Sequence, residues 1–417
     1  MARITQFWLP YNVSERADSA WFIDRLHKKY GEYVRIGPNL LSIADPDMVE
    51  PIHAPGTRFT KGQWYDVAKP LTTVQQMREK HMHDRHRKSA WDPAFTASSL
   101  RNYDPRILKH ANKLMSHLRN TSGQSVNATQ WMSFFSFDVM GDLSFGKHFG
   151  LLETGKPHLY MELVHTNGRA FGVFGSCGWL LHTVMALIPE EWTPMNKMLL
   201  YSREAIKDRK AYEPALPDIM SSLLKVDRFM SSAKDEDLLL EGNKLRQELV
   251  ENGIRDDDTF EVSKVAKLPY LNAVIDEALR MHPPTPGGLH RKPPPEGVRL
   301  GDHYIPGEIQ VLTPTHSIQH SIRAFVKPDE FIPERWTTQP ELILNKQAFF
   351  PFSMNSWGCI GKQLAYNELR TVVSKLVLGF DMTFAPGEDG TDILTKSQDV
   401  FTVTCAPLHL VFTPVEA

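Results

Sequence analysis

The sequence is poor in cysteine, in long apolar runs and in net charge, and each shortage excludes a class of protein. Its 417 residues include only three cysteines, Cys177, Cys359 and Cys405, with no C-x-x-C pair. An odd, widely spaced set excludes a disulfide framework and a structural zinc cluster. Lys and Arg number 47 against 49 Asp and Glu, for a net charge of −2. With no long basic run, this balance argues against nucleic acid as a partner.

The apolar runs are equally limited. The best of them, residues 178–189, contains His182 and ends at Pro189. A membrane-spanning helix needs about 20 apolar residues, so we expect a chain that is soluble or at most peripheral. The first ten residues are too few and too polar for a signal peptide or a membrane anchor. Hydrophobic residues at 41% and charged residues at 23% are ordinary values for a globular protein, which excludes wholesale disorder.

What is present is a helix-rich pattern with a few short strands. Alternation on both sides of Gly37-Pro38-Asn39 predicts a β-hairpin near the N-terminus. Apolar spacing predicts helices over residues 76–90, most of 103–225, 268–281 and 361–378, and strands within 288–314 and, as two runs, 398–413. We therefore expect a mainly α (α+β) chain with small sheets, organised as one domain over residues 1–417.

Cys359 is the first candidate for chemistry. It follows Gly358 and comes just before Gly361 and a predicted amphipathic helix. The N-terminus of a helix carries partial positive charge and free N–H donors, which stabilise a thiolate. Such a thiolate could serve as a nucleophile or as a metal ligand, although no cysteine-protease motif surrounds it. Taken alone, a buried and inert cysteine is the simpler interpretation.

Two further motifs are weak when each is taken alone. Glu277 and Arg280 share one face of a predicted helix, and the loop at residues 331–336 offers a second arginine, Arg335. An E-x-x-R match is expected about once by chance in a chain of this size. An ordinary surface pair and an ordinary loop would account for them.

In this order and spacing, however, the three motifs resemble those of the cytochrome P-450 family of heme-thiolate monooxygenases. The E-x-x-R helix ends in His282-Pro283-Pro284, P-E-R-W follows, and Phe352 lies seven residues before the cysteine. The chain is most similar to fungal members that act in small-molecule biosynthesis. The resemblance covers nearly the whole chain, including residues 30–39, 137–146 and 268–270. It implies the helix-rich cytochrome P-450 fold.

The resemblance implies heme b (iron protoporphyrin IX) as the cofactor. Cys359 would be the axial ligand of the heme iron, which favours O–O cleavage by electron donation. Glu277, Arg280 and Arg335 would form the buried ion-paired triad that holds the cysteine loop. A triad of this kind is expected to matter more for fold specificity than for net stability.

The resemblance also implies the other contacts of the heme. Phe352 would pack beneath it near the sulfur, and Gly361 would let the following helix approach closely. Arg291 matches the family's contact to a heme propionate, and Arg87 and His83 are the best candidates for further propionate contacts on the helix before Trp91. Taken alone, the histidines around His83 have no acidic or cysteine partner to complete a metal site, so a solvated helix face is favoured.

Two residues of the cysteine loop differ from the family's usual pattern. Asn355 stands where the family usually has Gly, and Trp357 where it usually has Arg or, in some fungal members, Tyr. Asn tolerates a positive φ better than most residues, so we expect the turn to be retained. Trp357 removes a cationic propionate partner, although its indole N–H can donate one hydrogen bond.

A larger difference concerns the distal side of the heme. Family members have a long helix there with an [A/G]-G-x-[D/E]-[T/S] motif that serves proton delivery, and this sequence contains no such motif. Only 26 residues lie between Glu241 and Leu268, whereas a helix of ~45 Å needs ~30 residues at 1.5 Å per residue. We expect an internal deletion near Gly242 and Asn243, either in the gene model or in the protein.

The resemblance implies a monooxygenase that inserts one oxygen atom of O2 into a lipophilic small molecule, as a step in fungal secondary metabolism. Its electrons would come from an NADPH–cytochrome P-450 reductase-type flavoprotein. Family members are usually anchored at the cytosolic face of the endoplasmic reticulum. Two alternatives remain open: a non-catalytic heme-binding remnant, which the missing distal motif supports, and a heme-free scaffold or interaction protein. Asn355 and Trp357 favour the scaffold, and the complete triad argues against it.

Overall fold

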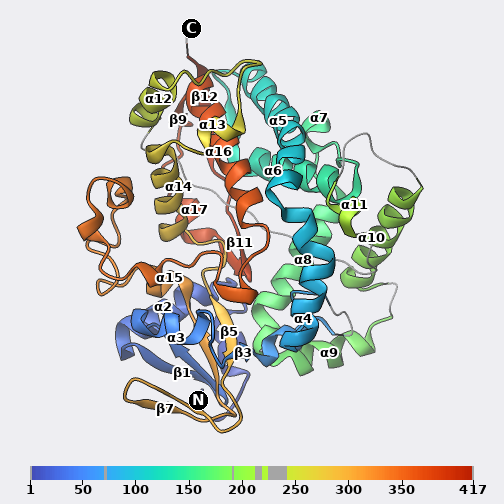
Figure 1. The fold of residues 1–417 in the computed structure, drawn as a ribbon. Helices are drawn as coiled ribbons and strands as arrows, with labels where there is room; N and C mark the ends of the chain where they lie inside the picture. The colour runs from blue at the N-terminus through green and yellow to red at the C-terminus, as the bar shows by residue number, and fades with distance from the viewer. Residues whose placement is uncertain (1, 70–72, 190–191, 212–217, 224–241, 416–417) are drawn as a thin grey trace.

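The computed structural model describes residues 2–69, 73–189, 192–211, 218–223 and 242–415. Helices dominate it, with one sheet at the end of the molecule that holds the N-terminus and another near the C-terminus (Figure 1). The helices are α1 (Trp8–Val13), α2 (Ser19–Tyr30), α3 (Val49–His53), α4 (Lys80–His86), α5 (Ala97–Asn120), α6 (Ala128–Phe145), α7 (Leu151–Thr154), α8 (Leu159–Phe174), α9 (Gly178–Leu187), α10 (Pro194–Lys210), α11 (Ile219–Leu223), α12 (Gly242–Glu251), α13 (Val262–Val265), α14 (Pro269–Met281), α15 (Thr315–Gln319), α16 (Lys362–Gly379) and α17 (Thr391–Lys396). The predicted mainly α class is confirmed.

The strands form four small sheets. They are β1 (Tyr33–Gly37), β2 (Leu40–Ile43), β3 (Thr60–Lys61), β4 (Ser125–Asn127), β5 (Leu289–Lys292), β6 (Val298–Leu300), β7 (His303–Ile305), β8 (Gln310–Thr313), β9 (Phe380–Phe384), β10 (Gln398–Val400), β11 (Thr402–Thr404) and β12 (His409–Pro414). The largest sheet has the order β1-β2-β8-β5-β3. The predicted hairpin is confirmed as β1 and β2, and the parallel pairing of β2 with β8 joins it to a segment far away in sequence.

The C-terminal segment contains three strands, where the sequence predicted two runs. A turn at Phe401, which has a φ of +84°, divides the first run into the hairpin β10–β11. The last strand, β12, pairs instead with β4 and β9. A left-handed residue at the turn lets a hairpin reverse within very few residues, and hydrophobic alternation does not reveal such a turn.

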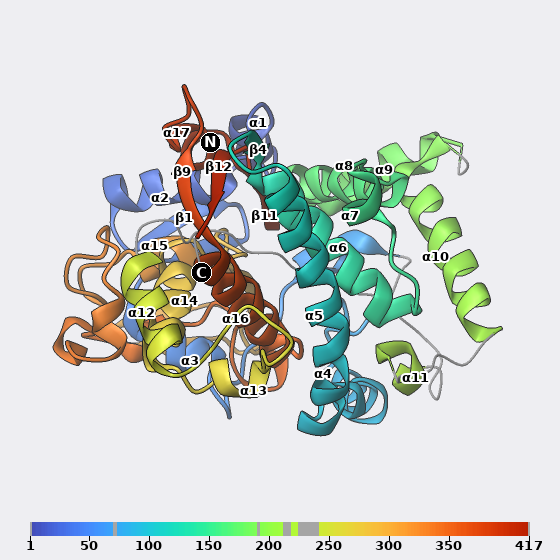
Figure 2. The same ribbon diagram turned by 90° about the horizontal axis from the view of Figure 1, so that it is seen from above.

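Helix α16 lies between two hydrophobic cores. Leu364 and Val372 pack into the core formed with α5 and α6, whereas Tyr366, Val373 and Val377 pack into the core formed with α12, α13 and α14. The view from above shows α16 between α5 on one side and α14 on the other (Figure 2). Because both faces are buried, the start of this helix, and with it the preceding loop, has a defined position.

The predicted helix at 76–90 is shorter and less regular than expected. It starts only at Lys80, and Arg87–Trp91 form a π-helical turn at its end. A start at residue 76 would use the carbonyl group of Gln75 for the first helical hydrogen bond. The carbonyl oxygens of Val74 and Gln75, just before that point, accept hydrogen bonds from the Lys61 ammonium at 3.1 and 2.7 Å. This tertiary contact overrides the local helical pattern.

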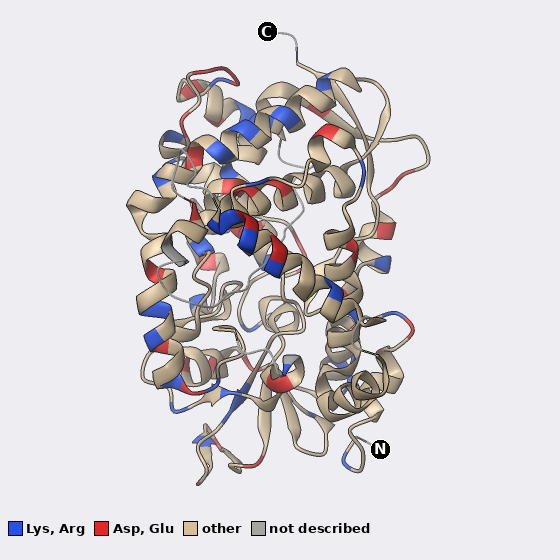
Figure 3. Cartoon of the chain, turned by 90° about the vertical axis from the view of Figure 1, so that its right-hand side faces the viewer, with Lys and Arg blue, Asp and Glu red and all other residues tan. Residues whose placement is uncertain are grey.

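One stretch among the described residues has the length and composition of a membrane-crossing segment, contrary to expectation. It covers Leu159–Leu187, 29 residues with a mean hydropathy of 1.5 over its best window. The apolar run singled out in the sequence covers only its second half. The stretch is α8, a 3-10 turn and α9 rather than one regular helix. Residues of α8 such as Leu163 and Val173 are buried in the domain. In contrast, α9 buries none of its residues and has no Lys, Arg, Asp or Glu, while other helices on this side carry charges of both signs (Figure 3).

Helix α8 and the β10–β11 hairpin pack with almost no space between their backbones. A Cβ atom at Gly172 would lie 2.6 Å from Cα of Val400 and 2.8 Å from the carbonyl oxygen of Asp399. Since these are backbone atoms, they cannot move aside by changing a rotamer. Gly172 therefore sets the distance between this helix and the hairpin.

Replacing Gly172 with Ala is expected to lower the free energy of unfolding by about 1–3 kcal/mol, because the hairpin must shift. Equilibrium urea unfolding measures this. Gly168→Ala is the matched control on the same helix. Its Cβ would come no nearer than 3.3 Å to the Val400 side chain and 3.7 Å to the Val400 carbonyl oxygen, and Ala gains about 1 kcal/mol of helix propensity. Equal effects of the two substitutions would contradict the close approach.

Candidate functional site

The loop before α16 folds back on itself and places Cys359 at the start of that helix. The backbone N–H of Cys359 donates to the carbonyl oxygen of Phe352 at 2.8 Å, and that of Gly358 donates to Asn355 at 3.0 Å. Ser353 and Asn355 have positive φ values of 56° and 65°. Asn355 is thus left-handed, as predicted, and its side chain accepts a hydrogen bond from the N–H of Ser356 at 2.6 Å.

The Cys359 side chain is accessible, yet protein surrounds its sulfur closely enough to change its acidity. Burial raises the pKa of the thiol, and the backbone N–H groups of Gly361 and Lys362 together with the charge of Arg87 act in the opposite direction. These donors belong to the first residues of α16, whose orphan N–H groups favour negative charge. The arrangement can hold a thiolate once a cation binds to the sulfur.

Arg87 and His83 both contact this loop. The Arg87 guanidinium donates to the carbonyl oxygens of Ser356 and Gly358, at 2.8 and 2.7 Å. The His83 ring packs on Trp357 with a centroid distance of 4.4 Å. Burial, with the nearby charge of Lys61, lowers the pKa of His83 to about 4, so this imidazole is neutral at pH 7.

Arg291 is buried beside the same loop, but its guanidinium N–H groups form few good hydrogen bonds. The residue is 1% exposed, and its contacts with the hydroxyl groups of Tyr65 and Ser353 are both 3.4 Å long, beyond the usual range of an N–H···O hydrogen bond. Within the described chain, its Nε has no hydrogen-bond partner. A buried guanidinium with an unused donor is costly unless a ligand completes it.

Glu277, Arg280 and Arg335 meet in the core, where all three side chains are 0% exposed. Glu277 accepts two hydrogen bonds from Arg280 at 2.9 Å each and one from Arg335 at 3.0 Å. The indole N–H of Trp336 completes its shell at 2.9 Å. Burial by itself raises the pKa of Glu277, but the bond to Arg280 and the charges of both arginines outweigh it and leave the pKa below its ordinary value.

Gln319 connects this triad to the cysteine loop. Its side-chain amide donates to the carbonyl oxygens of Leu279 and Arg280 and accepts from the backbone N–H of Phe350 at 3.2 Å. Arg280 in turn donates to the carbonyl oxygen of Gln319 at 2.9 Å. The end of α14 and the beginning of the loop are therefore held by one buried network.

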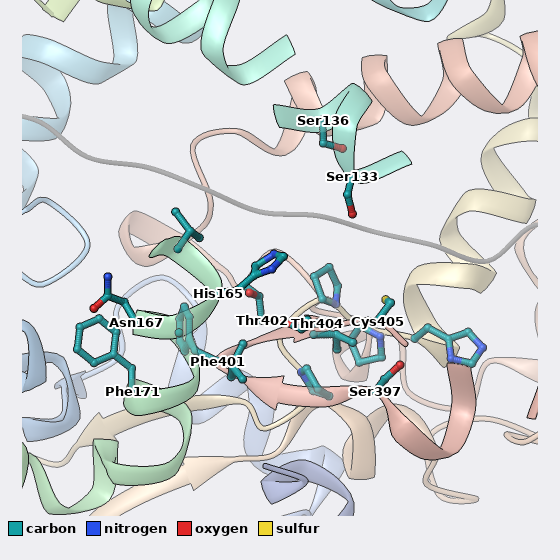
Figure 4. Close-up of a pocket in the computed structure, with 18 of the residues that line it drawn as sticks. Ser133, Ser136, His165, Asn167, Phe171, Ser397, Phe401, Thr402, Thr404 and Cys405 are labelled. Atoms are coloured by element: carbon teal, nitrogen blue, oxygen red, sulfur yellow. The ribbon is translucent and has the colours of Figure 1, made fainter. Parts of the chain in front are cut away.

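A cavity of about 430 Å³ lies between α6, α8 and the β10–β11 hairpin. Figure 4 shows Ser133 and Ser136 on one side of it, His165, Asn167 and Phe171 on α8, and residues 397–405 on the other side. Trp64 stacks on Phe401 at its edge, with a centroid distance of 4.7 Å. No Lys, Arg, Asp or Glu occurs among the described lining residues. Tyr65 lines the cavity and also contacts Arg291, so the cavity lies next to the buried cations.

The motifs, the helix-rich fold and the site agree with one family model, "Cytochrome P450", which matches residues 4–209 and 242–412. The chain belongs to the cytochrome P450 family. Cytochrome P450 monooxygenase FCK2 of Fusarium pseudograminearum is 32% identical over 444 residues, covering 99% of this chain and 80% of that protein. Tryprostatin B 6-hydroxylase of Aspergillus fumigatus is 32% identical over 446 residues, covering 99% and 79%.

Solved structures show the same fold. The crystal structure of the cytochrome P450DA heme domain superposes with a TM-score of 0.75 at 17% identity, covering 97% of this chain and 95% of that one. A second cytochrome P450, CYP102L1, superposes with a TM-score of 0.77 at 17% identity. Cytochromes P450 are oxidoreductases with a heme cofactor, and they use a redox partner, a substrate and O2.

The residues of this chain fit a heme. Cys359 is an exposed residue whose thiol lies next to the N–H groups of Gly361 and Lys362 at the start of α16. The unpartnered Nε of Arg291 and the neighbouring cations suit the carboxylates of heme propionates. Of the expected heme contacts, the structure brings Cys359, Phe352, Gly361, Arg87 and His83 to one loop and its surroundings, with Arg291 next to Ser353 of that loop.

Gly361 has more room than its expected role requires from the protein alone. A Cβ there would lie 3.8 Å from Sγ of Cys359 and 4.0 Å from Phe95, which are ordinary van der Waals distances. Any need for glycine at this position must therefore come from the bound heme rather than from neighbouring side chains.

No sequence motif indicated Lys61, Tyr65 or the residues that line the cavity. Lys61 lies opposite Arg291 in the β3–β5 strand pair. The sequence pattern of the short strand β3 does not predict this register. The adjacent aromatic residues Trp64 and Tyr65 were the one available signal. The predicted junction near Gly242 and Asn243 falls at the start of α12, and the residues just before it lie outside the described part of the chain.

The triad provides a stability test. Replacing Glu277 with Gln leaves two buried guanidinium groups without a counter-charge, and we expect the free energy of unfolding to fall by about 3–5 kcal/mol, measured by urea unfolding. Arg323→Ala is the control, since Arg323 is 45% exposed in a surface network and should cost less than about 1 kcal/mol. Similar losses of unfolding free energy in the two variants would show that the triad contributes no more to stability than an exposed ion pair.

Proposed function

We propose that this protein is a heme-thiolate monooxygenase that inserts one oxygen atom of O2 into a lipophilic small molecule in fungal secondary metabolism. The position of Cys359, an exposed residue held in front of α16 by the hydrogen bond from its backbone N–H to Phe352, is the observation that supports it most. Named relatives in fungi include a hydroxylase of tryprostatin B, which supports hydroxylation of a small metabolite.

Each site residue has a defined task in this proposal. The heme, when bound, supplies the oxygen chemistry. Cys359 would bind the iron through Sγ, Phe352 would pack next to the sulfur, and Gly361 would leave room for the macrocycle. Arg291, Arg87 and His83 would hold the propionates, with His83 as a neutral donor because its pKa is about 4.

Glu277, Arg280 and Arg335 do not touch the heme in this proposal; they position the loop through Gln319. Arg280 and Gln319 bond to each other, and Gln319 accepts from the N–H of Phe350 at the start of that loop. A change in this triad is therefore expected to act on the loop and on stability together.

The cavity supports a neutral and largely apolar substrate. An ionised substrate would lose its hydration there without gaining an oppositely charged partner, because the described lining has no charged side chain apart from histidine. The Trp64–Phe401 pair offers a flat aromatic wall, and Ser133, Ser136 and Asn167 offer hydrogen bonds.

We propose an NADPH–cytochrome P450 reductase-type flavoprotein as the electron donor, and attachment at the endoplasmic reticulum as in other fungal members.

The same proposal includes an internal deletion of the distal helix near residues 242–243. The alignment with FCK2 spans 444 residues against the 417 of this chain, so at least 27 positions have no counterpart here. The family model also stops at residue 209 and resumes at 242. A missed exon would explain the gap; a non-catalytic heme-binding remnant is the alternative, and the absent [A/G]-G-x-[D/E]-[T/S] motif favours it.

The heme ligand is tested by replacing Cys359 with Ala and recording the carbon monoxide difference spectrum of the dithionite-reduced protein. We expect the parent chain to show the strongly red-shifted Soret band of a thiolate complex and the variant to lack it, because the variant has lost the thiol that would bind the iron. Cys405→Ala is the control: it removes the cysteine that lines the cavity and should leave the band in place. An unchanged band in Cys359→Ala would refute the assignment of Cys359 as the iron ligand. A parent chain that binds no heme would favour the alternative of a heme-free scaffold protein.

The deletion is tested by inserting the distal helix of the Aspergillus fumigatus relative, ~30 residues, between Gly242 and Asn243. We expect heme binding in both chains but substrate-dependent NADPH consumption only after the insertion, since the inserted acid and hydroxyl provide proton delivery. An insertion with both groups replaced by Ala is the control. Full turnover by the parent chain would contradict the deletion, and sequencing the transcript across codons 240 to 245 distinguishes a missed exon from a true remnant.

A further inference from the structure

Lys61 is a buried lysine without a counter-charge. The residue is 5% exposed, and its ammonium donates only to the backbone carbonyl oxygens of Val74 and Gln75, at 3.1 and 2.7 Å. Among the described residues, no Asp or Glu forms an ion pair with it. Lysine is almost never fully buried unless it is paired, so the position calls for an anion.

The positively charged neighbours of Lys61 make an anionic partner still more favourable. It lies directly opposite Arg291 in the antiparallel β3–β5 pair, and like charges in that position are destabilising. Burial, followed by the charges of Arg291 and Arg87, lowers the pKa of Lys61 to about 7. Asp92 contacts Arg87, but Arg291 has no carboxylate partner among the described residues. Two facing cations are therefore left uncompensated in the interior.

The position of the Lys61 ammonium indicates where the anion should bind. Its Nζ lies 4.7 Å from the ring centroid of Trp357 and 5.2 Å from that of Tyr65, and these aromatic faces hold the ammonium by cation–π attraction. Trp357 occupies the loop position that usually carries arginine in this family. A cation thus stands over that position, but it comes from another strand.

We propose that Lys61 donates to a carboxylate of the heme propionates, together with Arg291, and so replaces the cation that Trp357 removes. This inference rests on the proposed heme function. The carboxylate neutralises the facing pair and accepts from the unused Nε of Arg291. Charge-assisted hydrogen bonds of this kind are among the strongest in proteins.

The test measures heme retention by the intact holoprotein. Lys61→Gln keeps an N–H donor for the carbonyl oxygens of Val74 and Gln75 but removes the charge, and we expect hemin transfer to excess apomyoglobin to become at least about tenfold faster. Lys61→Arg should restore a rate close to that of the parent. Lys264→Gln, an exposed lysine of α13 paired with Glu261, is the matched control and should leave the rate unchanged.

A second measurement separates a propionate contact from a merely structural role. The same proteins are loaded with the dimethyl ester of heme, whose propionates carry no charge. We expect the difference between the parent and Lys61→Gln to disappear with the ester, because the charged acceptor is gone. A structural lysine would affect retention of both porphyrins equally.

The outcomes are distinct. If the parent retains heme and Lys61→Gln loses it at the parent rate, or loses heme and its ester equally faster, the role of Lys61 is overturned while the heme function stands. If the parent binds no heme at all, the proposed function fails and the role of Lys61 fails with it.

Discussion

The carboxylate of Glu277 pairs with two guanidinium groups in a part of the core that solvent does not reach. An unpaired charge in such a place costs several kcal/mol, so the chain must bring Arg280 and Arg335 to it with good geometry. Doing so holds α14 against the loop that contains Arg335. Through Gln319 and Phe350 the same network extends to the start of the cysteine loop, and the position of Cys359 depends on it.

The surroundings of Arg291 differ from the triad in both charge and hydrogen bonding. In the triad every donor and acceptor has a partner, and the carboxylate of Glu277 is shared by the two guanidinium groups. Around Arg291 and Lys61 positive charge accumulates on facing strands, one guanidinium donor is unused, and the described residues supply no carboxylate to either residue. A protein can keep such a surplus where a bound ligand brings the missing negative charge. The fully hydrogen-bonded cluster thus supports the loop, and the cluster of Arg291 and Lys61 is the one that we propose to bind the ligand.

The cysteine loop and the elements that hold it lie in one continuous part of the chain. Helix α16, the cysteine loop, α14 and the triad all lie within the segment from residue 242 onward that the family model matches, and α16 has a packed core on each of its two faces. The cavity on the other side is built from α6, α8 and the C-terminal hairpin. Helix α6 belongs both to the core around α16 and to the wall of the cavity, so the cysteine loop and the cavity are built on one shared framework.

Much of this follows from the sequence by itself, because local chemistry determines it. The spacing of Glu277, Arg280, Arg335 and Cys359 indicates the family. The glycines near the cysteine and the apolar period of the last long helix indicate a helix directly after the thiol. The tolerance of Asn355 for a positive φ is likewise a local property, and the structure has it.

Tertiary structure alone decided the rest. The pairing of β3 with β5 places Lys61 opposite Arg291, the ammonium of Lys61 delays the start of α4, and Phe401 divides the last strands. These outcomes depend on contacts between segments far apart in the chain. The energy of such contacts is set by partners that no local pattern contains.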